Sequence, residues 1–115
     1  EVHFEALNLD DASLVIVAYG SASRSALSAL RMARQKRLKV GLFRPITLFP
    51  FPYEALSSLA KRVGNFLVAE LSLGQLIEDV KLAVGLDKRV ELVNEYGGVP
   101  LSADEILEAV EKMAG

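Results

Sequence analysis

The sequence contains no cysteine, and this absence excludes several kinds of site at once. Without a thiolate, the chain cannot form a disulfide, act as a cysteine nucleophile, or ligate zinc or an iron–sulfur cluster through sulfur. His3 is the sole histidine, so neither a histidine metal site nor a Ser-His-Asp triad can be assembled. We therefore assign no metal ligand and no catalytic residue.

Long apolar runs and an excess of positive charge are also missing. No apolar run approaches the roughly 18–20 residues needed to cross a bilayer, so we expect no contact with a membrane. A formal net charge of −2 argues against a dedicated nucleic-acid binder, whose affinity depends on neutralising phosphates. The first residues lack the basic start and apolar stretch of a signal peptide, and we expect a cytoplasmic location.

The 115 residues, 51% of them hydrophobic, are enough for one domain with a buried core. The first residue is Glu1, with no methionine before it. We interpret residues 1–115 as a single domain belonging to a longer polypeptide.

Short apolar runs alternate with amphipathic segments along the chain. Four runs have the length and composition of strands, at residues 14–19, 40–43, 66–69 and 90–93, the last of them weaker because Glu91 interrupts it. The β-branched content of the first suits a strand buried on both faces. Apolar residues recur at helical spacing after each run, and the first helix is expected over residues 23–36 with Ser21 or Ser23 as N-cap. Ser102 and Glu105 have the spacing of a capping box at the start of the last helix.

This alternation predicts right-handed crossovers and a mainly parallel sheet with helices on both faces. The expected fold is therefore a three-layer α/β/α domain with four or five strands. The fifth would be an antiparallel edge strand formed by residues 2–7, where apolar and polar side chains alternate.

Polar residues follow the strands at the edge of the sheet where ligands bind in such folds. Ser21 and Arg24 lie in the turn after the first predicted strand, where helix amides could hold a phosphate or a carboxylate. The turn lacks the glycines of the dinucleotide and P-loop fingerprints, which favours a plain turn capped by serine.

Glu70 ends the third predicted strand, close to Gln75 at the start of the next helix. A partly buried carboxylate could act as a general acid or base, or orient a cofactor. The sequence places no histidine or second carboxylate beside it, so we favour a structural carboxylate satisfied by helix amides or by a partner arginine.

Residues 44–52 contain three of the four prolines and two phenylalanines. Proline fixes the backbone and removes amide donors, which predicts a stiff, apolar connection. Exposed phenylalanines on an isolated domain would form an adhesive patch. We therefore expect Arg44, Phe49 and Phe51 to pack on another domain or subunit.

Three segments together resemble the C-terminal part of the α subunit of 2-oxoacid:ferredoxin oxidoreductases, most of all the 2-oxoglutarate type. They are residues 17–21 with Arg24, the Arg-Pro-Ile-Thr-Leu-Phe-Pro-Phe-Pro string at 44–52, and the string from Glu70 to Gly74-Gln75. Ser72 departs from the pattern, because the family often has asparagine there.

The resemblance implies a fold similar to the transketolase C-terminal domain and a parent enzyme that converts a 2-oxoacid to acyl-CoA and reduces ferredoxin. That parent is implied to use thiamine diphosphate, Mg²⁺, an iron–sulfur cluster and coenzyme A, none of them bound by this piece. The implied partners are the β subunit, the pyrimidine-binding domain of the same complex and, through the holoenzyme, ferredoxin. The expected role is an inactive scaffold.

Two alternatives stay open. The chain could be the C-terminal domain of a transketolase-like enzyme or of a 2-oxoacid dehydrogenase E1 component. It could also be a stand-alone module that binds an anion or a nucleotide at residues 20–24.

Overall fold

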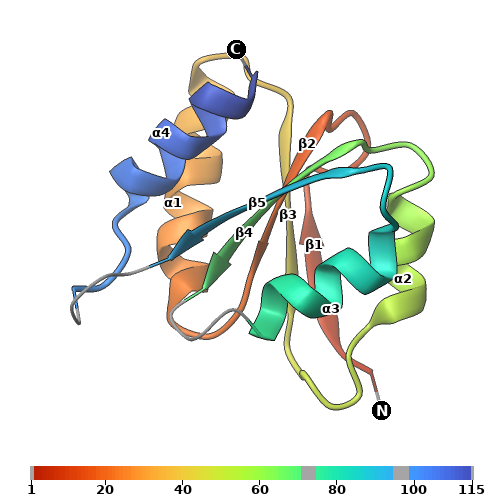
Figure 1. Ribbon diagram of the computed structural model, residues 1–115. Helices are drawn as coiled ribbons and strands as arrows, with labels where there is room; N and C mark the ends of the chain where they lie inside the picture. The colour runs from red at the N-terminus through yellow and green to blue at the C-terminus, as the bar shows by residue number, and fades with distance from the viewer. Residues whose placement is uncertain (1, 71–74, 95–98, 115) are drawn as a thin grey trace.

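The computed structural model describes residues 2–70, 75–94 and 99–114, whose strands form one five-stranded sheet (Figure 1). The strands are β1 (Phe4–Leu7), β2 (Leu14–Ala18), β3 (Val40–Pro45), β4 (Asn65–Glu70) and β5 (Arg89–Asn94). Their order in the sheet is β1-β3-β2-β4-β5. All neighbours run parallel except β1, which pairs antiparallel with β3. The predicted mainly parallel sheet is confirmed, with five strands and the antiparallel edge strand.

Helices cover both faces of the sheet, as the predicted three-layer fold requires. They are α1 (Ala22–Gln35), α2 (Tyr53–Leu59), α3 (Gln75–Val84) and α4 (Ala103–Ala114). Figure 1 shows α1 and α4 together on one face and α2 and α3 on the other. Because it is covered on both faces, the central strand β2 is buried along its whole length.

The core consists of two apolar clusters, one on each face of the sheet. Side chains alternate across a strand, so Ile16 of β2 joins the cluster under α1 and α4, whereas Val15 and Val17 join the cluster under α2 and α3. Every apolar residue of β2 thus contributes to one core or the other, which explains why the sequence there is a continuous apolar run.

The start of α1 differs from the prediction. The helix begins at Ala22, and Ser21 at the N-cap position makes no side-chain capping hydrogen bond. Its backbone is already helical, with φ −66° and ψ −23°, whereas a capping residue is normally extended so that its oxygen reaches the second or third amide. The predicted serine cap is therefore wrong at this helix.

The capping box of α4 is confirmed. The Glu105 amide donates to Ser102 Oγ at 3.1 Å, and the Ser102 amide donates to Glu105 Oε1 at 3.0 Å. The remaining boundaries lie within two residues of those predicted.

Candidate functional site

Two cavities lie at the carboxyl ends of the parallel strands, and Gly20 and Ser21 of the β2–α1 turn line both of them. In the sheet, β3 lies on one side of β2 and β4 lies on the other. The turn after β2 is therefore the topological switch point of the sheet. Gly20 has φ +66°, a left-handed conformation that glycine adopts without strain. The sheet therefore opens where ligands bind in folds of this class.

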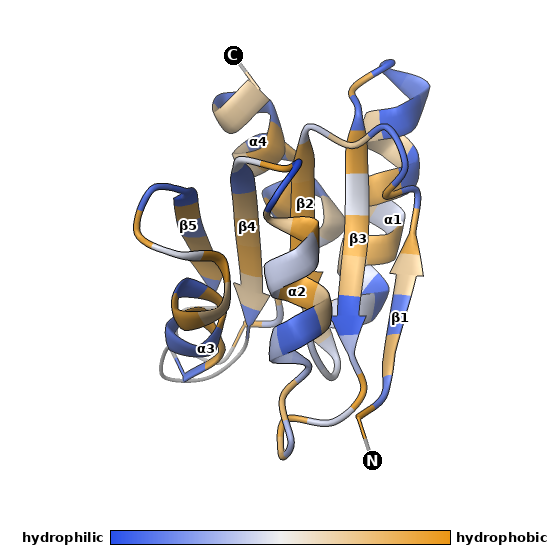
Figure 2. Cartoon of the chain, turned by 90° about the vertical axis from the view of Figure 1, so that its right-hand side faces the viewer, coloured by the Kyte–Doolittle hydropathy of each residue, from blue (hydrophilic) through white to orange (hydrophobic). Residues whose placement is uncertain are grey.

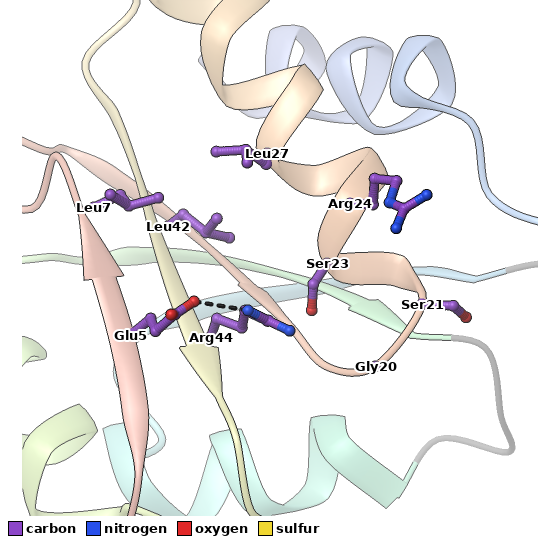
Figure 3. Close-up of a pocket in the computed structure, with 9 residues that line it drawn as sticks. All are labelled: Glu5, Leu7, Gly20, Ser21, Ser23, Arg24, Leu27, Leu42 and Arg44. Atoms are coloured by element: carbon purple, nitrogen blue, oxygen red, sulfur yellow. Dashed lines mark hydrogen bonds and ion pairs between the residues drawn. The ribbon is translucent and has the colours of Figure 1, made fainter.

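The cavity on the β3 side, here called the arginine cavity, has a volume of about 580 Å³ (Figure 3). Arg24 of α1, Arg44 of β3 and Glu5 of β1 line it. Arg44 Nη1 donates to Glu5 Oε1 at 2.7 Å, an ion pair across the antiparallel strands, whose register places these residues opposite each other. This pairing engages only one edge of the guanidinium.

Two buried donors in the arginine cavity have no partner within the described part of the chain. Ser23 is only 6% exposed, and its Oγ makes no hydrogen bond; the same holds for the buried Nε of Arg44. Figure 3 shows both side chains pointing into the space between α1 and β3. Because buried polar groups are nearly always hydrogen-bonded, these two are unusual.

The cavity on the β4 side, here called the glutamate cavity, has a volume of about 310 Å³. Glu70 and Gln75 line it together with Tyr19 and two leucines. Glu70 is 4% exposed; its Oε2 accepts a hydrogen bond from the Leu76 amide at 3.1 Å, while Oε1 has no partner among the described residues. Burial raises the pKa of Glu70, and hydrogen bonds from the Leu76 and Ile77 backbone oppose that rise.

The described residues that line the glutamate cavity offer few groups for acid–base or metal chemistry. Among the residues that line it, Tyr19 is the one other titratable side chain. The described residues contain no group of three or more His, Cys, Asp or Glu side chains placed to hold a metal ion. With one carboxylate among its described lining residues, the cavity does not offer the several protein oxygens that hold a Ca²⁺ ion.

The connection between β3 and α2, residues 46–52, is here called the proline arm. Figure 2 shows it reaching beyond the sheet at the end where the N-terminus lies. Phe49 is 92% exposed, but Phe51 is only 5% exposed and packs in the core under α2 and α3. Phe51 precedes the helix cap and Leu56 is the fourth residue of α2, which are the positions of a hydrophobic staple.

The expectation that Phe51 packs on another domain is therefore wrong, because this domain's own core uses it. The spacing between Phe51 and Leu56 was the signal that could have shown this. The other predicted residues do gather at the strand ends: Ser21, Arg24 and Arg44 in the arginine cavity, and Ser21, Glu70 and Gln75 in the glutamate cavity. Sequence reasoning missed Glu5, and it considered Ser23 as a candidate N-cap in the turn rather than as a buried hydroxyl. Ser72 lies outside the described residues.

Within the described residues, no helix combines the length and apolar character that a bilayer crossing requires.

Comparison with known proteins gives consistent matches over almost the whole chain. Residues 12–106 match the family described as pyruvate:ferredoxin oxidoreductase core domain II. The ketoisovalerate oxidoreductase subunit VorB of Methanothermobacter marburgensis is 47% identical over all 115 residues, which cover 32% of that subunit. The chain thus spans about a third of the length of this relative.

Two solved structures share the fold. A chain of the 2-oxoglutarate:ferredoxin oxidoreductase from Magnetococcus marinus, with 2-oxoglutarate, coenzyme A and succinyl-CoA bound, has a TM-score of 0.86 at 20% identity, covering 98% of this chain and 20% of that one. A split gene transketolase, an inactive beta4 tetramer, has a TM-score of 0.78 at 23% identity, covering 94% of this chain and 40% of that one. At these identities the similarity establishes the three-layer, transketolase-like fold.

Proposed function

Because the chain belongs to the family of the pyruvate:ferredoxin oxidoreductase core domain II, we propose that it is the scaffold domain of the α subunit of a 2-oxoacid:ferredoxin oxidoreductase. The parent enzyme would be cytoplasmic, convert a 2-oxoacid to acyl-CoA, and pass the electrons to ferredoxin. This domain would supply no catalytic residue. It would hold neighbouring domains in register, since small displacements of reacting groups cost much of an enzyme's rate.

The observation that carries the scaffold role is the exposure of Phe49 at the tip of the proline arm. Val2, Phe4, Ile46 and Tyr53 are each about two-fifths exposed, and three of them line a hollow of about 590 Å³ beside α2. An exposed aromatic side chain is a typical anchor of a protein–protein interface. We propose that the pyrimidine-binding domain or the β subunit covers it.

The cofactors of the parent enzyme would be held elsewhere. A cysteine-ligated iron–sulfur cluster needs thiolates that this sequence does not have. Thiamine diphosphate, Mg²⁺ and coenzyme A would likewise lie in other parts of the complex. Ser21, Arg24, Glu70 and Gln75 would make polar contacts at the strand ends. A transketolase-like parent is supported only by similarity of fold.

The scaffold role is tested by replacing Phe49 with serine in the full α subunit and measuring its association with the β subunit by sedimentation. Loss of an interface anchor costs more than about 1 kcal/mol, so we expect association about tenfold weaker. Leu86→Ser is the matched control, because Leu86 is fully exposed but lies before β5, at the opposite end of the sheet. Association with the β subunit and thermal unfolding of the α subunit both unchanged in Phe49→Ser, or association equally weakened in Leu86→Ser, would contradict the proposal.

A further inference from the structure

We propose that the arginine cavity binds a tetrahedral oxyanion of the phosphate type, between the start of α1 and Arg44 of β3. The cavity lies at the topological switch point and holds about 580 Å³, which is ample for a phosphoryl group. This site is additional to the scaffold role and does not depend on it.

The first element of the site is the N-terminus of α1. The first amides of a helix have no acceptor within the helix, and the helix dipole makes this end attractive to anions. At α1 the Ser23 amide donates to Gly20 O at 3.0 Å, but the Ser21 side chain makes no capping hydrogen bond to a further amide. Ser21, Ser23 and Arg24 all line the cavity, so the helix start opens on it.

The second and independent element is the pair of buried donors without partners. Ser23 is only 6% exposed, and neither its Oγ nor Arg44 Nε has a partner among the described residues. Figure 3 shows the two side chains pointing into the same space. Leaving two such donors unpaired costs free energy that an accepting ligand would recover. An anion between them would accept from both.

Charge and geometry favour a phosphate over a carboxylate. Arg24, Arg44 and Glu5 give the cavity a net charge of +1, counting two cations and one anion. Glu5 is mostly solvated and holds Arg44 through Nη1 alone, which leaves Nε for a ligand. The donors approach from the helix end, from a serine hydroxyl and from a strand, directions that a tetrahedral group can meet and a planar carboxylate meets less well.

The test is a titration of the ¹⁵N-labelled chain with inorganic phosphate at neutral pH and constant ionic strength, followed by NMR. We expect saturable shifts confined to the amides of residues 20–24 and the Nε–H of Arg44. Ser23→Ala should weaken binding about tenfold, since it removes one hydrogen bond to a charged group. Its fold should be retained, because the hydroxyl has no partner to lose.

Three further variants separate a built site from general charge. Arg44→Lys keeps the charge but removes the Nε donor, and it should also weaken binding. Arg31→Gln is the control for Arg24→Gln, since Arg31 lies on the same helix roughly 10 Å further along. Absence of saturable shifts, equal binding by Ser23→Ala, equal effects of the two glutamine variants, or acetate binding as tightly as phosphate would each overturn the proposal. Because no partner subunit is present, these outcomes leave the scaffold proposal untouched.

Discussion

At the scale of single residues, Glu70 is the one buried charged side chain among the described residues. It sits at the end of β4 with one carboxylate oxygen bonded to the start of α3 and the other without a described partner. Burial disfavours its charged form more than the two backbone hydrogen bonds favour it, so the pKa is raised. The side chain thus ties β4 to α3 while weakening the fold whenever it is ionised.

Glu70→Gln should therefore change stability in a pH-dependent way. A carboxyl whose pKa is higher in the folded state stabilises the fold fully below its unfolded pKa, and that contribution is lost as the pH rises through the raised folded pKa. A glutamine side chain has no charged form and keeps this stabilising contribution as the pH rises. The free energy of unfolding of Glu70→Gln relative to the parent should therefore rise between about pH 4 and pH 7. Urea unfolding at both pH values measures this. A falling difference between Glu70→Gln and the parent over this pH range would contradict the assignment.

At the scale of elements, features set by residues close together in the sequence could be predicted, whereas features that depend on contacts between distant segments could not. The capping box of α4 could be read from two residues three apart, and the buried strands from continuous apolar runs. Arg34 could not be found this way: it donates to Val40 O at 2.8 Å and to Asn8 O at 2.9 Å, and pairs with Asp11 at 2.7 Å. These partners belong to the start of β3 and to the β1–β2 connection, which only the folded chain brings together.

The candidate site follows the same division. The rule that parallel strands present their carboxyl ends at one edge was enough to place Ser21 and Arg24 there, whereas Arg44, which lines the same cavity, was assigned to contacts with another domain. It could not show that the hydroxyl of Ser23 would be left without a partner, because this depends on the helix starting one residue early. Phe51 was placed wrongly because its contacts were inferred from its place in a proline-rich loop, although its spacing to Leu56 is that of a hydrophobic staple within the domain.

The capping box gives a prediction for one element. Ser102→Ala removes the oxygen that accepts from the Glu105 amide, and we expect it to lower the free energy of unfolding by about 1 kcal/mol. Thermal or urea unfolding of the chain measures the loss. The same substitution at Ser57, exposed in the interior of α2, should change stability by less than about 0.5 kcal/mol. Equal losses at the two serines would mean that the box contributes nothing.

At the scale of the whole molecule, the features proposed to contact ligands or partners gather at one end of the sheet. Both cavities lie at the carboxyl ends of the parallel strands, and the proline arm leaves the carboxyl end of β3. The arm is also tied to the N-terminal strand, since the Ile46 amide donates to His3 O at 2.9 Å. One end of the rigid sheet thus carries the arginine and glutamate cavities beside the apolar proline arm. This arrangement is suited to binding a neighbouring domain.

That rigidity requires the two cores to unfold together, since they share one sheet. Ile106 of α4 and Ile77 of α3 belong to the clusters on opposite faces and offer the same substitution. Each Ile→Val change should cost about 0.5–1.5 kcal/mol in urea unfolding, with a single transition. Because the sites share no cluster, the double variant should lose the sum of the two within about 0.5 kcal/mol. Two separate transitions, or one face unfolding alone in its variant, would show that the layers are independent and that the domain could not hold its neighbours as one body.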